Sequence, residues 1–172
     1  MQWFRPHEIW KGQEPRIYEN GIEPSDVNQG YLGNCYFLAS LSALAEFPER
    51  IEALFCTKEV NKAGIYAMNF FINGIKQVVI VDDLIPCRVF ANSVKPIFAN
   101  SKSHELWVIL LEKAWAKLHG SYKRSESGYP YFSMSHITGV PSQRFLHDDV
   151  TTGKIPSINN EADFYEQIKK AD

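Results

Sequence analysis

The spacing of hydrophobic residues along the chain predicts two principal helices. Apolar residues recur at helical spacing through residues 35–47, and Pro48 interrupts the pattern. A clearer pattern runs through residues 105–119 and stops at Gly120, a residue type that often terminates helices. We expect the apolar side of this second helix to pack in the core against the first; that side carries Trp107, Leu111, Ala114, Trp115 and Leu118.

Between these helices, two segments have the composition of β-strands. Residues 65–72 and 75–81 are rich in aromatic and β-branched side chains, which favour strands. Asn73 and Gly74 join them, and this pair is typical of a two-residue hairpin turn. Helices with a β-hairpin at their side predict an α+β fold.

The remaining segments are predicted to be mostly loop. Prolines break up residues 1–28, so we expect an irregular segment there. Residues 84–104 are expected to form a loop with a short strand near 97–99. Shorter elements are predicted at 49–55, 131–137 and 161–170 as helices and at 142–146 as a strand.

Composition narrows the class of protein. With 45% hydrophobic and 22% charged residues, the 172-residue chain has an ordinary globular composition. A net charge of −2 gives no electrostatic reason to expect nucleic acid or an anionic membrane as a partner. No apolar run reaches the roughly 20 residues of a membrane helix, and the polar N-terminus lacks a signal-peptide core. The three cysteines have no metal-ligand spacing and suit a reducing compartment, so we expect a cytoplasmic protein.

Cys35 is the candidate nucleophile. Asn34 is a suitable N-cap, so Cys35 is expected at the first helical position, where the helix dipole favours a thiolate. Gly30 and Gly33 are expected to bracket a tight turn before it. If the chain doubles back there, the side-chain amide of Gln29 and the Cys35 backbone N–H can converge and stabilise an oxyanion. A single cysteine in apolar surroundings is more often a buried hydrophobic residue, so the surrounding pattern has to decide.

That pattern, Gln-Gly-x-x-Gly-Asn-Cys-Tyr from Gln29 to Tyr36, resembles the active-site segment of the calpain family of cysteine proteases. The family pattern is Gln-Gly-x-x-Gly-Asp/Asn-Cys, followed by an aromatic residue and an apolar helix. Further resemblances occur in the family's order, at Trp3–Ile9, Val81–Pro86, Glu105–Tyr122 and Thr138–Val140. Val140 stands where the family has a second glycine.

The resemblance implies a papain-like protease core. Residues 1–125 would form its Cys-bearing first lobe, and residues 126–172 would begin the second lobe. Cys35 would be the nucleophile and Gln29 the oxyanion donor of an endopeptidase that cleaves intracellular proteins. The family's histidine and asparagine contexts, Gly-His-Ala and Asn-Pro-Trp-Gly, do not occur here, and none of the five histidines is assigned as the base. We therefore expect an incomplete core that is inactive alone and needs the second lobe and flanking regulatory domains.

The resemblance also implies a Ca²⁺ site. Family members often bind Ca²⁺ in the first lobe through two acidic residues, which correspond here to Asp26 and Glu105. Carbonyl oxygens of Glu19 and Gly21 would complete the donors, a mixture that Ca²⁺ favours. Alternatively, Asp26 only hydrogen-bonds its own loop and Glu105 only caps the helix start.

Gly128 corresponds to a family glycine whose backbone pairs with an extended substrate, although a simple turn glycine fits as well. Asp82 and Asp83 end a predicted strand and are interpreted as turn-forming. Two other functions stay open: a non-catalytic calpain-like module that binds calcium or protein, and another papain-like acyl chemistry such as amide transfer. The presence of both Cys35 and Gln29 favours catalysis.

Overall fold

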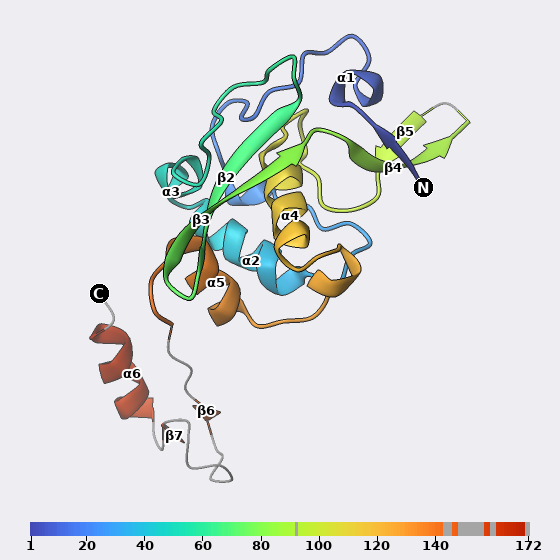
Figure 1. Cartoon of the computed structure of the whole chain (residues 1–172). Coiled ribbons are helices and arrows are strands. Elements are labelled where there is room, and N and C mark those ends of the chain that lie inside the picture. The colour runs from blue at the N-terminus through green and yellow to red at the C-terminus, as the bar shows by residue number, and fades with distance from the viewer. Residues whose placement is uncertain (92, 143–145, 148–156, 159–160, 171–172) are drawn as a thin grey trace. The chain divides into compact units, whose positions relative to one another are not determined.

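The fold is described from a computed structural model that covers residues 1–91, 93–142, 146–147, 157–158 and 161–170 (Figure 1). The chain divides into two units, Met1–Val140 and Pro141–Asp172, and each is described by itself. The first unit mixes helices and strands, which confirms the α+β class. This unit continues past residue 125, and the assignment of residues 1–125 and 126–172 to two lobes remains a prediction.

Helices α2 (Cys35–Leu44) and α4 (Trp107–Leu118) are the two helices that the hydrophobic spacing predicts. Gly120 follows α4 with a φ of 86°, a left-handed conformation that suits glycine and ends the helix. Two shorter predicted helices are also present, as α3 (Pro48–Glu52) and α5 (Pro130–Thr138). Both begin with proline, which is favourable at a first helical position because its missing N–H would have no partner there.

Helix α4 is the centre of the core. Trp107, Leu111, Ala114 and Trp115 are buried and Leu118 is half-buried, so the predicted apolar side is confirmed. The Trp115 indole stacks on the Phe37 ring of α2 with 4.6 Å between ring centroids. This contact joins the two helices as the sequence predicts, because large aromatic side chains bury most apolar area per residue.

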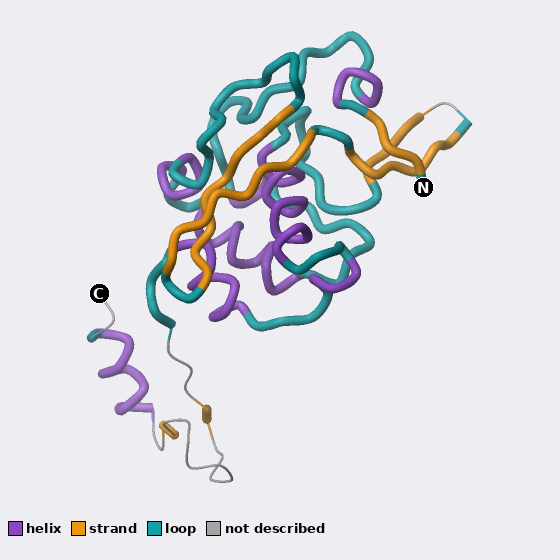
Figure 2. Tube along the Cα trace, in the orientation of Figure 1, coloured by secondary structure: helices purple, strands orange, loops and turns teal. Residues whose placement is uncertain are grey.

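Strands β2 (Ile65–Ile72) and β3 (Ile75–Asp82) form the predicted antiparallel hairpin (Figure 2). Asn73 and Gly74 have φ values of 53° and 76°, as a type I′ turn requires. One face of the hairpin covers the helices and supplies the core with Tyr66, Met68, Phe70, Val79 and Val81.

A second sheet near the N-terminus was not predicted. It has the order β1-β4-β5, formed by β1 (Gln2–Phe4), β4 (Ile85–Phe90) and β5 (Ser93–Pro96). The prediction of an irregular segment at 1–28 is therefore wrong for residues 2–9 and right for residues 10–23, which form no helix or strand. The prediction of a loop at 84–104 is wrong for the two strands and right for residues 97–104, so the short strand expected at 97–99 is absent. Pro6, which was expected to break up residues 1–28, begins the short helix α1 (Pro6–Ile9). Pro86 lies inside β4 and Pro96 ends β5, although proline is usually disfavoured within a sheet.

The second unit contains β6 (Leu146–His147), β7 (Ser157–Ile158) and α6 (Glu161–Lys169). The two strands pair in parallel, and α6 confirms the last predicted helix. Most of the strand predicted at 142–146 lies outside the described residues; Leu146 begins β6. No helix among the residues described here has the length and apolar character needed to cross a membrane.

Candidate active site

Cys35 occupies the first position of α2, and its side chain is exposed. The next three residues of the helix are buried, so the thiol stands at the surface end of a helix that is otherwise fixed in the core. The other two cysteines differ from it. Cys87 is fully buried, and burial raises the pKa of its thiol to about 11, whereas the exposed Cys56 donates a hydrogen bond to Asn69 Oδ1.

Asn34 is the N-cap residue of α2, but its side chain does not cap the helix. Its Nδ2 instead donates to Glu112 Oε1 on α4, at 2.7 Å. The predicted side-chain cap is therefore wrong. A buried carboxylate accepts the amide N–H of Asn34 and turns that side chain towards the core rather than towards the first turn.

Glu112 was not identified from the sequence. It is 2% exposed, and its second oxygen, Oε2, accepts the backbone N–H of Ala99 at 2.9 Å. Burial raises the pKa of Glu112 to about 7, although the hydrogen bonds from Asn34 and Ala99 favour its charged form. The available signal was an acidic residue directly after the apolar run Trp107–Leu111 of α4.

The segment before Cys35 lies against residues 97–100. Asn28 and Asn100 exchange backbone hydrogen bonds of 3.0 Å in both directions, and Tyr31 N–H donates to Ile97 C=O at 3.0 Å. Gly30 is required by this contact, because a Cβ there would lie 2.2 Å from the backbone oxygen of Phe98. A Cβ on Gly33 would make only ordinary van der Waals contacts, the nearest with Glu126 Cγ at 3.8 Å. Neither glycine has a positive φ, so the backbone conformation does not require glycine at either position. The close approach of residues 97–98 requires glycine at position 30 only.

The side chain of Gln29 bends back towards its own loop. Its Nε2 donates to Leu32 C=O at 2.8 Å. An amide nitrogen carries two hydrogens, so this bond fixes the side chain while leaving a second donor. Its convergence with the backbone N–H of Cys35 remains a prediction.

Tyr36, which follows the candidate nucleophile, explains the glycine at 128. Its hydroxyl donates to Ser125 C=O at 2.9 Å and accepts a hydrogen bond from Trp115 Nε1 at 3.0 Å. A Cβ on Gly128 would lie 2.6 Å from this phenol ring, so only glycine fits without displacement. Gly128 is nevertheless exposed, and its pairing with substrate stays a prediction.

The two acidic residues expected at a calcium site lie in different environments. Glu105 is 2% exposed; its Oε1 accepts the backbone N–H of Glu19 and its Oε2 accepts Trp107 Nε1, both at 3.0 Å. Burial raises the pKa of Glu105, and the negative charge of Asp26 raises it further. Asp26 accepts the backbone N–H of Glu23 at 2.8 Å, as the alternative interpretation expects, but Glu105 does not cap α4.

The loop that precedes Asp26 is sharply bent at Asn20 and Gly21. Asn20 and Gly21 have φ values of 59° and 106°, and glycine adopts the second without strain. Within the described part of the chain, no three His, Cys, Asp or Glu side chains gather closely enough to hold a metal. A cation here would therefore need carbonyl oxygens of the loop beside the carboxylates of Asp26 and Glu105. Carboxylate and carbonyl oxygens are the donors that Ca²⁺ prefers, and calcium binding at this place remains a prediction.

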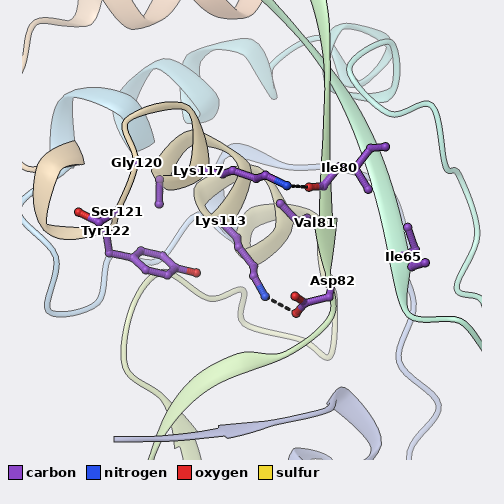
Figure 3. Close-up of a pocket in the computed structure, with 10 residues that line it drawn as sticks. Ile65, Ile80, Val81, Asp82, Lys113, Lys117, Gly120, Ser121 and Tyr122 are labelled. Carbon is purple, nitrogen blue, oxygen red and sulfur yellow. Dashed lines mark hydrogen bonds and ion pairs between the residues drawn. The ribbon is translucent and has the colours of Figure 1, made fainter.

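The acidic pair at the end of β3 has a structural role. Asp82 accepts the N–H of Leu84 at 2.8 Å, which confirms the predicted turn, and Lys113 Nζ lies 2.5 Å from its carboxylate (Figure 3). Burial alone would raise the pKa of Asp82, but its hydrogen bonds with Lys113 and Leu84 lower it. Asp83 pairs with Arg5 at 2.6 Å. The hollow of about 420 Å³ beside Asp82 contains none of the expected site residues.

Two of the described histidines lie with a ring nitrogen close to a backbone carbonyl of the preceding helical turn. His119 lies at the C-terminus of α4, as expected, and its Nδ1 lies 2.9 Å from Trp115 C=O. His136 Nδ1 makes the same type of contact, 2.8 Å from Phe132 C=O within α5. The side chain of His147 lies outside the described part of the structure.

Comparison with known proteins gives a consistent result. The sequence model of a family described as calpain family cysteine protease matches residues 1–172. Calpain-type cysteine protease ADL1 of Oryza sativa subsp. japonica is 43% identical over 143 residues, covering 80% of this chain and 6% of that protein. Calpain-5 of Caenorhabditis elegans is 33% identical over 172 residues, covering 92% of this chain and 26% of that protein. The chain thus spans only a small part of the length of these relatives.

Replacing Gly30 by Ala is expected to destabilise the fold by about 1–3 kcal/mol, because the new Cβ would collide with backbone that cannot move independently. Gly33→Ala is the matched control, since a methyl group there meets only ordinary contacts. Urea unfolding of the two variants measures the difference. Equal stabilities would contradict the proposed close approach of residues 97–98 to this segment.

Proposed function

The chain belongs to the calpain family of cysteine proteases, and we propose that it is the nucleophile-bearing lobe of a papain-like, thiol-dependent endopeptidase core. The observation that carries this proposal is the exposed thiol of Cys35 at the first position of a helix whose following residues are buried. A buried thiol would be an ordinary packing residue. An exposed thiol at a helix N-terminus, held by a fixed preceding segment, suits a nucleophile.

In the proposed reaction, the Cys35 sulfur attacks the carbonyl carbon of a peptide bond and forms a thioester as the amine leaves. The first helical N–H groups have no acceptor within the helix, so the backbone N–H of Cys35 can donate to the developing oxyanion. The second N–H of the Gln29 amide would be the other donor. Water then hydrolyses the thioester and restores the thiol.

The base that takes the thiol proton, and the residue that orients it, are proposed to come from the second lobe of a longer protein. This is supported by the small share of the relatives that the chain spans, 6% to 26% in the comparisons above. It is also supported by the contacts of His119 and His136, whose Nδ1 atoms face backbone carbonyls of their own helices. On this proposal, the 172-residue chain alone is proteolytically inactive.

We propose intracellular proteins as substrates, bound in extended form beside Cys35 in the cytoplasm. Gly128 would pair with the substrate backbone, which requires exposed main-chain groups. Its exposure supports this role, while the Tyr36 ring accounts for the absence of a side chain. The alternative, a non-catalytic module that binds calcium or protein, gives no reason for an exposed thiol at this position.

We further propose that Asp26, Glu105 and the carbonyl oxygens of Glu19 and Gly21 bind Ca²⁺. When bound, the cation would neutralise both carboxylates. The loop that contains Glu19 already contacts Glu105 through its backbone N–H, so ion binding there would fix this loop to the start of α4. Calcium would then act on the rigidity of the lobe rather than on the chemistry of Cys35.

A thiol-directed epoxide inhibitor, applied to the protein that contains both lobes, is expected to label Cys35 in preference to Cys56, which is also exposed. Peptide mapping by mass spectrometry identifies the labelled residue. Cys56→Ser should retain full labelling and Cys35→Ser should lose it. Equal labelling of the two cysteines would argue against an activated nucleophile at Cys35.

Calcium titration of the 172-residue chain by calorimetry is expected to show binding that Asp26→Asn and Glu105→Gln each weaken at least about tenfold, since each removes an anionic ligand. Glu23→Gln is the control, because this carboxylate belongs to the same segment but not to the proposed donor set. Since burial raises the pKa of Glu105, protons compete with calcium at a higher pH than at an ordinary glutamate, and binding should weaken as pH falls. A folded chain that gives no calcium heat would remove the site.

A further inference from the structure

The carboxylate of Glu112 lies inside the first unit with both oxygens engaged by different segments of the chain. Asn34 Nδ2 donates to Oε1 at 2.7 Å, and the Ala99 backbone N–H donates to Oε2 at 2.9 Å. Glu112 itself belongs to α4, in which nine of the twelve residues are buried. The Glu112 side chain therefore connects α4 to Asn34, the residue before Cys35, and to Ala99 in the segment that begins at Ile97.

This position is significant because the same two segments already meet along their backbones. The hydrogen bonds between Asn28 and Asn100 and between Tyr31 and Ile97 hold the beginning of the segment that leads to Cys35. Glu112 supplies the corresponding connection at its other end, one residue before the thiol. Without the carboxylate, that end would lose its link to residues 97–100.

Burying the carboxylate of Glu112 has an unfavourable desolvation free energy. Desolvation disfavours its charge, and an apolar side chain of similar size would usually stabilise a core at least as well. A packing role alone does not explain why both oxygens receive donors. The side chain is better explained by what it orients, which is the amide of Asn34.

We propose that Glu112 is a positioning residue for Cys35: through the Asn34 amide it fixes the first backbone N–H groups of α2 against residues 97–100. This inference rests on the proposed function, because it assigns a use to those N–H groups. It adds a residue that touches neither the thiol nor the substrate. Its effect on Cys35 is transmitted through one hydrogen bond and the peptide group that follows.

The Asn34 amide can serve both charge states of Glu112. The carboxylate accepts from Nδ2, as observed. A protonated carboxyl carries an O–H donor, which would pair with Asn34 Oδ1 after the amide turns, and this oxygen is buried with no hydrogen bond among the described contacts. The charged form dominates above the raised pKa of about 7 and the neutral form below it.

No cationic side chain lies within ion-pair distance of Glu112 in the described part of the chain. The titratable group that does face it is the phenol of Tyr122, which follows α4; burial raises the pKa of this phenol, and the charge of Glu112 raises it further. Tyr122 therefore stays neutral at physiological pH. Of these two groups, Glu112 is the one that changes charge near neutral pH.

NMR of the 172-residue chain tests the proposal without requiring activity. In the wild-type chain, the side-chain amide of Asn34 and the backbone amides of Cys35 and Tyr36 should shift together with a midpoint near pH 7. Glu112→Gln should abolish this titration while retaining the fold, because its amide can accept from Ala99 and donate to Asn34 Oδ1. Signals that do not titrate in the wild-type chain, or that titrate equally in Glu112→Gln, would overturn the proposal.

Hydrogen exchange provides a second test. Glu112→Leu should accelerate amide exchange at residues 28–36 and 97–100 at least tenfold relative to the rest of the unit. Leu111→Ala is the matched control, since it truncates the neighbouring buried side chain of α4 and should not single out these segments. Asn34→Leu removes the same hydrogen bond from its other end and should reproduce the Glu112→Leu pattern, also in the event that Glu112→Leu does not fold. Exchange that is uniform, or equal to that of Leu111→Ala, would contradict the proposal.

These measurements separate the positioning role from the proposed function. If the titration and the local exchange effect appear but the epoxide does not select Cys35, the connection through Glu112 stands and the protease assignment fails. If the epoxide selects Cys35 but neither effect appears, the positioning role fails alone.

Discussion

The packing of the first turn of α2 against α4 is the interaction on which the candidate site depends. Phe37 stacks on Trp115, and the hydroxyl of Tyr36 accepts the indole N–H of the same tryptophan. Asn34 completes the contact by donating to Glu112. These three side chains surround Cys35 in the sequence and all point into the core, so the thiol between them is left at the surface. Core packing, rather than any feature of the cysteine itself, determines its exposure.

Helix α4 also brings two buried glutamates to the loops that carry the candidate chemistry. Glu105, just before the helix, accepts the backbone N–H of Glu19 in the bent loop near Asp26. Glu112, within the helix, accepts the N–H of Ala99 and the amide of Asn34. In both cases burial raises the carboxyl pKa, and hydrogen bonds from the chain oppose that shift. In both places a buried carboxylate of known position accepts a backbone N–H from a loop, that of Glu19 or that of Ala99.

The helices and the hairpin could be predicted from the sequence, because each follows from a pattern of neighbouring residues. The hairpin around Asn73 and Gly74 follows from turn chemistry, and α4 follows from its hydrophobic spacing. The β1-β4-β5 sheet could not be predicted in this way, because β1 pairs with a strand more than 80 positions away and the short strands β4 and β5 include two prolines. At the site, the place of Cys35 at the first position of α2 was predictable, whereas its exposure came only from the structure. The partner of Asn34 was not predictable, because it lies 78 positions away and no local rule indicates it.

The most direct test of the central claim is the rate of peptide hydrolysis by the protein that contains both lobes. The account predicts that Cys35→Ala abolishes hydrolysis and that Gln29→Ala lowers kcat by about 10²–10³, the usual cost of removing one oxyanion donor. It also predicts that residues 1–172 alone release no product. Hydrolysis that survives Cys35→Ala, or that the isolated chain catalyses at the rate of the two-lobe protein, would contradict the assignment of Cys35 as the nucleophile of an incomplete core.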